Sequence, residues 1–164
     1  MKITLLTHFK ELEKRSNSGR LVVDVLGSDA EQIRWDRINP HPPLVQQIEA
    51  GGVVLIYPGV SNGNDDDLSD ISRCIIIDST WQEARKIHQR SPYLLNLRRI
   101  SLSTGNKSIY NLRKHQKESG LCTAECAIEV LRRAGNFEKA ELLQERFLSF
   151  IRPIGVMRGA VQGH

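Results

Sequence analysis

The stretch Cys74-Ile75-Ile76-Ile77-Asp78-Ser79-Thr80-Trp81 decides the fold class. Its first four residues are apolar and predict a short strand buried on both faces, as in parallel sheets. Polar residues and a tryptophan follow at once, and Trp81, Ala84 and Ile87 then recur at helical spacing through Arg90. A buried strand that turns directly into a helix is the unit from which α/β domains are built.

The rest of the chain fits the same pattern. Val53-Val54-Leu55-Ile56-Tyr57 is a second continuous apolar run, and further strands are expected at 2–7, 31–37 and 98–103. The run 21–26, ended by Gly27, is a strand or a buried helix, because its periodicity does not decide between them. Helices are expected at 9–16, 44–48, 121–134 and 137–151, the last ended by Pro153.

These elements predict one α/β domain with a mostly parallel sheet over residues 1–164. We expect its core within residues 1–134, a C-terminal helix at about 136–152 and a flexible tail at 153–164.

Composition narrows the class of protein. The chain has 164 residues, of which 40% are hydrophobic and 26% charged, as in ordinary globular domains. No apolar run approaches the ~18–20 residues that cross a bilayer, and the N-terminus lacks the pattern of a signal peptide. Three cysteines, an odd and sparse number, favour reduced thiols and a cytoplasmic location.

Charge is distributed unevenly along the chain. Residues 1–82 carry 8 basic and 12 acidic side chains (−4), whereas residues 83–164 carry 15 basic and 7 acidic ones (+8). The segment 85–117 holds nine Lys and Arg and no carboxylate. Such a segment attracts polyanions and favours a nucleic-acid partner, the alternative being a solvated face that aids solubility.

Three loops carry polar, aromatic or glycine residues of the kind that bind ligands, and they follow expected strands or precede a helix. They are Tyr57-Pro58-Gly59, Asp78-Ser79-Thr80-Trp81 and the segment before the helix at 121. Ligands of open parallel sheets bind beyond the carboxyl ends of the strands, so these loops are expected to form one site. Taken alone, Asp78 also fits a helix N-cap, and Trp81 either stacks on a base or packs in the core.

Several segments together resemble one known family. Asp78-Ser79-Thr80-Trp81-Gln82-Glu83-Ala84 resembles the Asp-x-Thr-Trp signature of the DTW-domain family, with its following Ala at the head of a helix. The other similar segments, over about residues 5–134 and in the family's order, are His8-Phe9-Lys10-Glu11, Asn17-Ser18-Gly19-Arg20-Leu21, Tyr57-Pro58-Gly59, Tyr110-x-x-Arg113 and Leu121-Cys122-Thr123-Ala124-Glu125-Cys126.

The resemblance implies a tRNA-uridine aminocarboxypropyltransferase. The family is similar to the SPOUT superfamily, whose C-terminal trefoil knot binds S-adenosylmethionine, and its members transfer the 3-amino-3-carboxypropyl group of that donor to N3 of a tRNA uridine. Alternatives are a SPOUT-type methyltransferase and a non-catalytic RNA-binding module. The expected partners are tRNA and S-adenosylmethionine, with no membrane, and the chain is a monomer or a homodimer.

The resemblance and the strand ends assign roles to individual residues. Asp78 is the candidate general base or base-orienting acceptor, and Glu125 is the second candidate, unless it only caps its own helix. The cofactor-binding candidates are Tyr57, Pro58, Gly59, Ser79, Thr80, Ser103, Thr104, Leu121 and Thr123. The RNA-binding candidates are Arg20, Trp81, Arg85, Lys86, Arg98, Arg99, Arg113 and Lys114.

Two positions depart from the family pattern. Cys122 stands where the family usually has Ser, and a thiol caps a helix poorly, while Cys126 replaces an alanine. The cysteine cluster that looks zinc-binding in many relatives is not found here, so we expect no metal. His8 either lines the site or is a hydrogen-bonded residue at a strand end, whereas the spacing of His88 indicates no role.

Overall fold

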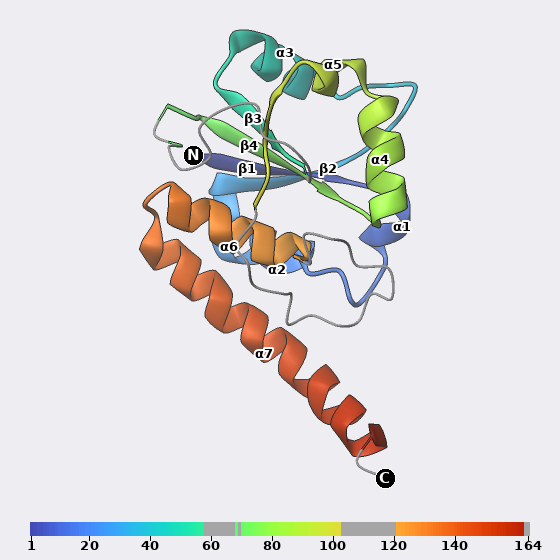
Figure 1. Ribbon diagram of the computed structural model, residues 1–164, viewed down its shortest axis with the longest axis vertical. Coiled ribbons are helices and arrows are strands. Elements are labelled where there is room, and N and C mark those ends of the chain that lie inside the picture. The colour runs from blue at the N-terminus through green and yellow to red at the C-terminus, as the bar shows by residue number, and fades with distance from the viewer. Residues whose placement is uncertain (58–67, 69, 103–120, 163–164) are drawn as a thin grey trace.

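The computed structural model describes residues 1–57, 68, 70–102 and 121–162, with side chains to Arg152. Within them lies one sheet of five strands, all parallel, in the order β2-β1-β4-β3-β5 (Figure 1). The strands are β1 (Lys2–Thr7), β2 (Ala30–Arg34), β3 (Val53–Ile56), β4 (Arg73–Asp78) and β5 (Arg98–Ile100). The predicted α/β class is confirmed.

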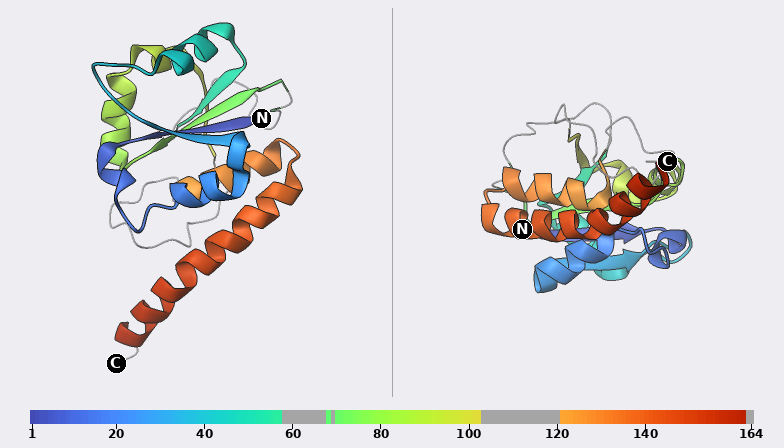
Figure 2. Two further views of the ribbon diagram at one scale, coloured as in Figure 1. Left: turned by 180° about the vertical axis from the view of Figure 1, so that it is seen from behind. Right: turned by 90° about the horizontal axis from the view of Figure 1, so that it is seen from below.

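Helices cover both faces of the sheet and form three layers (Figures 1 and 2). One face packs against α2 (Gly19–Leu26) and α6 (Thr123–Arg133), and α7 (Phe137–Gln162) packs against these two helices rather than against the strands. The other face packs against α3 (Pro42–Ala50), α4 (Trp81–Gln89) and α5 (Pro92–Leu95). Two short elements, α1 (Phe9–Leu12) and η1 (Gly27–Asp29), flank α2 in the chain.

The apolar runs are explained by this two-sided burial. In β4, Cys74 and Ile76 belong to the core under α2, α6 and α7, whereas Ile75 belongs to the core under α3, α4 and α5. Successive side chains of a strand point to opposite faces, so a strand covered on both sides must be apolar at each position.

Several elements differ from what the sequence predicted or settle what it left open. The helix expected at 9–16 ends at Leu12, the strand expected at 31–37 ends at Arg34, and α5 was not expected. The run that periodicity left undecided is helix α2, which buries Leu21, Val22 and Leu26 and ends at Gly27, whose φ is 56°. Pro153 does not end the last helix, because α7 continues to Gln162. The prediction of a helix end there was wrong: a proline removes one N–H donor from the helix, and the hydrogen bonds on either side can continue. Among the described helices, none is long and apolar enough to span a bilayer.

The sheet changes winding direction between β1 and β4. From β1 the chain passes to β2 on one side, whereas from β4 it passes over β3 to β5 on the other. Adjacent parallel strands whose connections leave in opposite directions open a crevice at their carboxyl ends, where ligands of α/β sheets bind. At that edge Thr7 of β1 lies in register with Asp78 of β4.

Candidate functional site

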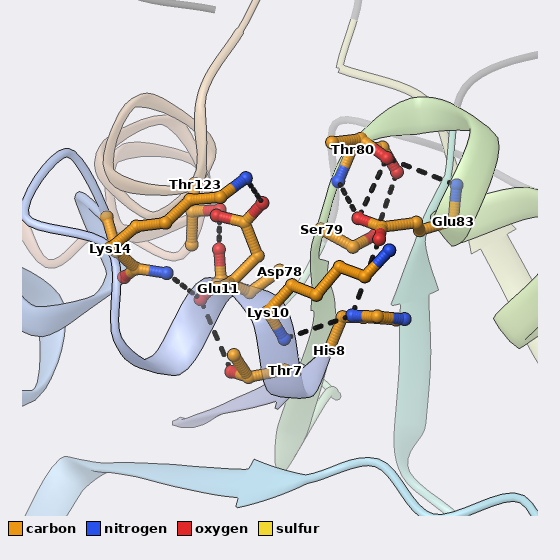
Figure 3. Close-up of polar contacts among 11 residues, drawn as sticks. Thr7, His8, Lys10, Glu11, Lys14, Asp78, Ser79, Thr80, Glu83 and Thr123 are labelled. Carbon is orange, nitrogen blue, oxygen red and sulfur yellow. Dashed lines mark hydrogen bonds and ion pairs between the residues drawn. The ribbon is translucent and has the colours of Figure 1, made fainter.

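Asp78 occupies the point where the winding direction changes, and it is fully buried. One carboxylate oxygen accepts hydrogen bonds from Asn17 Nδ2 (2.9 Å) and Thr7 Oγ1 (3.3 Å), and the other accepts one from Thr123 Oγ1 (2.8 Å) (Figure 3). These donors come from β1, from the loop before α2 and from the first turn of α6. Asp78 therefore joins three elements that are far apart in the sequence.

The N-termini of α2 and α6 both lie at this carboxylate. A Cβ on Gly19, the first residue of α2, would come within 2.8 Å of Asp78 Oδ2 and of Asn17 Oδ1. Ser18 Oγ accepts the backbone N–H of Ala124 (3.1 Å), which ties the start of α2 to the start of α6. Helix N-termini carry partial positive charge, so two of them stabilise a buried anion here.

Glu125 acts as a helix cap in this structure. Its Oε1 accepts the backbone N–H of Cys122 (3.1 Å), the residue before α6. Burial raises the pKa of the Cys122 thiol well above its usual range and that of Cys126 to about 12. Both cysteines are free, Cys122 buried and Cys126 partly buried, and a raised pKa keeps a thiol protonated and unreactive.

A second capping arrangement fixes the start of α4. Thr80 and Glu83 form a capping box, and Glu83 Oε2 also lies 3.4 Å from His8 Nδ1 (Figure 3). Burial raises the pKa of Glu83, but the hydrogen bonds from Thr80 and the positive charges of His8 and Lys10 outweigh it and lower that pKa. The Asp78–Trp81 turn is thus held rigidly against the end of β1.

An aromatic cluster lies at the end of β3. The Tyr57 ring centroid is 5.6 Å from that of Trp81 and 4.5 Å from that of His88. Burial raises the pKa of Tyr57 against the opposing effect of Arg85 and Arg99, and burial together with Arg99 lowers the pKa of His88. The cluster therefore combines flat apolar surface with nearby cations.

Two buried polar atoms at this edge have no hydrogen-bond partner among the described residues. They are Asn17 Oδ1, beside Asp78, and His88 Nε2, beside Tyr57. Buried polar atoms are normally satisfied by protein, water or ligand. A water molecule or a ligand that reaches them would complete their hydrogen bonding.

The structure places some of the residues that the sequence singled out in contact at this edge and others elsewhere in the described chain. Ser79 and Thr80 lie in the turn after β4, Thr123 contacts Asp78, and Leu121 packs partly buried against the core. Of the cations, Arg85 and Lys86 are exposed on α4, Arg98 and Arg99 are half-buried on β5, and exposed Arg20 donates to the carbonyl of Leu12 (2.9 Å). Six predicted residues lie outside the described part of the chain: Pro58, Gly59, Ser103, Thr104, Arg113 and Lys114.

Several residues at the site carried no assigned role in the sequence analysis. They are Thr7, Glu11, Asn17, Gly19 and His88. Glu11 is fully buried and accepts from Lys14 Nζ (2.9 Å). The motif around Asn17 and Gly19 was visible, but only the fold shows that it meets Asp78. No cluster of potential metal ligands occurs in the described residues.

Comparisons with known proteins agree with this arrangement. The DTW domain family matches residues 1–154. A tRNA-uridine aminocarboxypropyltransferase 2 of Macaca fascicularis is 30% identical over 112 residues, covering 65% of this chain and 37% of that protein. The protein of the same name in Drosophila melanogaster is 29% identical over 138 residues, covering 79% and 54%. The chain thus spans roughly a third to a half of these curated relatives. No solved structure matches it.

Proposed function

The chain belongs to the DTW-domain family, and we propose that it modifies tRNA by transferring the 3-amino-3-carboxypropyl group of S-adenosylmethionine to N3 of a uridine. One observation carries the proposal: segments of the family's motifs that are scattered along the sequence meet at one edge of the sheet. Thr123 and Asn17 hydrogen-bond Asp78, and Tyr57 contacts Trp81.

The donor site in this proposal lies at the carboxyl ends of β3, β4 and β5. Tyr57 and Trp81 offer ring surface for an adenine, and the unsatisfied His88 Nε2 offers a hydrogen-bonding atom. Arg99 is close enough to influence both Tyr57 and His88, and it suits the donor's carboxylate. The C-terminal trefoil knot stays a prediction, and the remaining cofactor-binding candidates Pro58, Gly59, Ser103 and Thr104 lie outside the described residues.

The donor, when bound, supplies an electrophilic γ-carbon and a sulfonium leaving group. In the reaction the uridine N3–H bond breaks and its proton passes to water, an N3–carbon bond forms, and the carbon–sulfur bond gives its electrons to sulfur, which leaves as a neutral thioether. The protein's main task is to align the uridine N3 with the γ-carbon, because the sulfonium sulfur carries three carbons that can each be attacked.

Asp78 serves as the orienting carboxylate in this proposal. Asp78 is fully buried and already accepts three hydrogen bonds. Such a carboxylate is better suited to orienting neighbouring groups than to taking a proton from the substrate. Glu125 already caps α6, which favours a structural role for it as well. The unsatisfied Asn17 Oδ1 beside Asp78 is the acceptor that this arrangement leaves for a ligand.

The tRNA in this proposal lies against the cations near the aromatic cluster, Arg85, Lys86, Arg98 and Arg99, with Arg113 and Lys114 of the segment that is not described. Phosphate contacts from such residues supply most of the affinity and make it salt-dependent. A cytoplasmic location and a monomeric or dimeric state remain predictions.

Incubation with S-adenosylmethionine and unmodified tRNA transcripts, followed by nucleoside mass spectrometry, tests the function. A uridine heavier by one aminocarboxypropyl group is the expected product. A methyl-sized gain would assign the chain to SPOUT-type methyl transfer, and tRNA binding without any mass change would assign it to RNA binding alone. Reactions without donor serve as the control.

A further inference from the structure

Three side chains form a continuous ring stack beside the site. The His8 ring centroid lies 4.7 Å from that of Phe9, at an interplanar angle of 28°, and 6.5 Å from that of Trp35, at 20°. The guanidinium of Arg34 lies over the Phe9 ring, 5.8 Å from its centroid. These residues follow or end β1 and β2, so the stack stands at the carboxyl edge.

The stack is fixed at one end and open at the other. Trp35 Nε1 donates to Ser91 Oγ (2.8 Å), and Ser91 Oγ donates to the carbonyl of Ile87 (2.5 Å), which anchors the inner ring to α4. At the outer end, Phe9 is 51% exposed and Arg34 is exposed. An exposed ring that is already ordered loses little entropy on binding, which favours recognition.

The stack is directly joined to the catalytic edge. The backbone N–H of His8 donates to the carbonyl of Asp78 (3.1 Å), and that of Trp35 donates to the carbonyl of Thr7 (2.8 Å). The side chain of Thr7 in turn donates to Asp78. Phe9 follows His8 in the chain, and the backbone of His8 contacts Asp78, so a base stacked on Phe9 would lie close to the candidate site.

The charge around the outer end suits a polyanion. Besides Arg34, the segments that carry the stack hold the exposed cations Lys10, Arg15 and Arg37, and Lys14, which pairs with buried Glu11. The same segments, residues 8–15 and 34–37, also hold the acids Glu11, Glu13 and Asp36, so that five cations against three acids give a net charge of +2, while Glu31 and Asp29 pair with Arg73 and Lys139 at the amino edge. Asp36 accepts the backbone N–H groups of Ile38 and Asn39.

We infer that the Phe9–Arg34 end of this stack is a base-stacking platform for an unpaired nucleotide of the RNA substrate, next to the nucleotide that is modified. This inference rests on the proposed function and adds a second RNA contact, on the acidic N-terminal half, to the basic one expected from the sequence. Unpaired bases stack on aromatic rings and on guanidinium planes, and the flanking cations bind phosphates.

Variants of exposed residues test the platform in the whole protein, with unmodified tRNA transcripts as the probe. Phe9→Ala is expected to weaken tRNA binding about 10-fold, the loss of one base stack, and Phe9→Trp to retain wild-type affinity. Arg34→Ala is expected to weaken binding and to lower the slope of log K against log salt by about one. Phe137→Ala and Arg146→Ala, exposed on α7, are the matched controls.

A stacking readout separates the platform from a simple loss of charge. The fluorescence of a 2-aminopurine in a single-stranded oligouridylate is expected to be quenched by wild-type protein and not by Phe9→Ala. Equal tRNA affinity for Phe9→Ala and Phe137→Ala would overturn the inference. So would a change in self-association without any change in RNA binding, since the surface would then hold protein.

The two proposals can fail separately. If wild-type protein forms the modified uridine and Phe9→Ala binds tRNA as tightly, only the platform is wrong. If wild-type protein forms no modified uridine but Phe9→Ala loses tRNA binding, the platform stands and the proposed reaction is wrong.

Discussion

The amino and carboxyl edges of the sheet handle charge in different ways. At the amino edge, Glu31 lies 2.5 Å from Arg73 and 3.8 Å from Lys2, so opposite charges neutralise each other across β2, β1 and β4. At the carboxyl edge, Asp78 accepts hydrogen bonds from the neutral side chains of Thr7, Asn17 and Thr123. Ion pairs stabilise the fold at the amino edge, whereas at the carboxyl edge a buried carboxylate is held at two helix N-termini.

Removing the buried anion is the strongest test of this contrast. Asp78→Ala is expected to abolish uridine modification, at least about 100-fold, and to lower the free energy of unfolding by ~2–4 kcal/mol, because three buried donors lose their acceptor. Product mass spectrometry and urea unfolding measure the two effects. Asp70→Ala, an exposed acid just before β4, is the control and should change neither.

Crowding the anion without removing it is the next test. Gly19→Ala places a methyl within 2.8 Å of Asp78 Oδ2 and Asn17 Oδ1, so one of these atoms must move. We expect ~1–3 kcal/mol of destabilisation and a larger proportional loss of turnover than of tRNA affinity. Asp24→Ala, exposed on the same helix, should leave both unchanged. A fully active Gly19→Ala variant would show that the position of Asp78 is not critical.

A substitution at the amino edge should lower stability but leave turnover nearly unchanged. Arg73→Met leaves Glu31 and Thr4 without their guanidinium partner, and we expect ~1–3 kcal/mol of lost stability, moderated by the partial exposure of Glu31. Turnover measured well below the unfolding transition should stay within about twofold of wild type. A marked fall in turnover of folded Arg73→Met would break the distinction between the two edges.

The smallest expected effect concerns pH. The pKa of Glu83 lies below its ordinary value of 4.5, so its charge stabilises the fold above that pH and the contribution disappears as pH falls through the lowered pKa. The stability advantage of wild type over Glu83→Gln, a few tenths of a kcal/mol, should therefore shrink on acidification. An advantage that grows as pH falls would contradict the assignment.

The sequence predicted elements correctly where burial alone determines the residue type. Continuous apolar runs predicted β3 and β4, and the polar turn after Ile77 indicated the carboxyl edge of the sheet. It could not decide the run 21–26, because a helix and a strand both bury Val22 and Leu26. Asn17 was visible as part of a motif, but its role was not, because its partner Asp78 is 61 positions away. The ring stack at Phe9 was not predicted, because it forms from residues at the ends of two adjacent strands.

The hydrogen bonds of Asp78 reach back 71 residues to Thr7 and forward 45 to Thr123. Closing such large loops is entropically costly and delays folding. A ribosome-bound chain that has not yet released α6 thus lacks one of the clamps on this carboxylate. The set of hydrogen bonds around Asp78 is consequently complete only after α6 has been synthesised and has packed against β4.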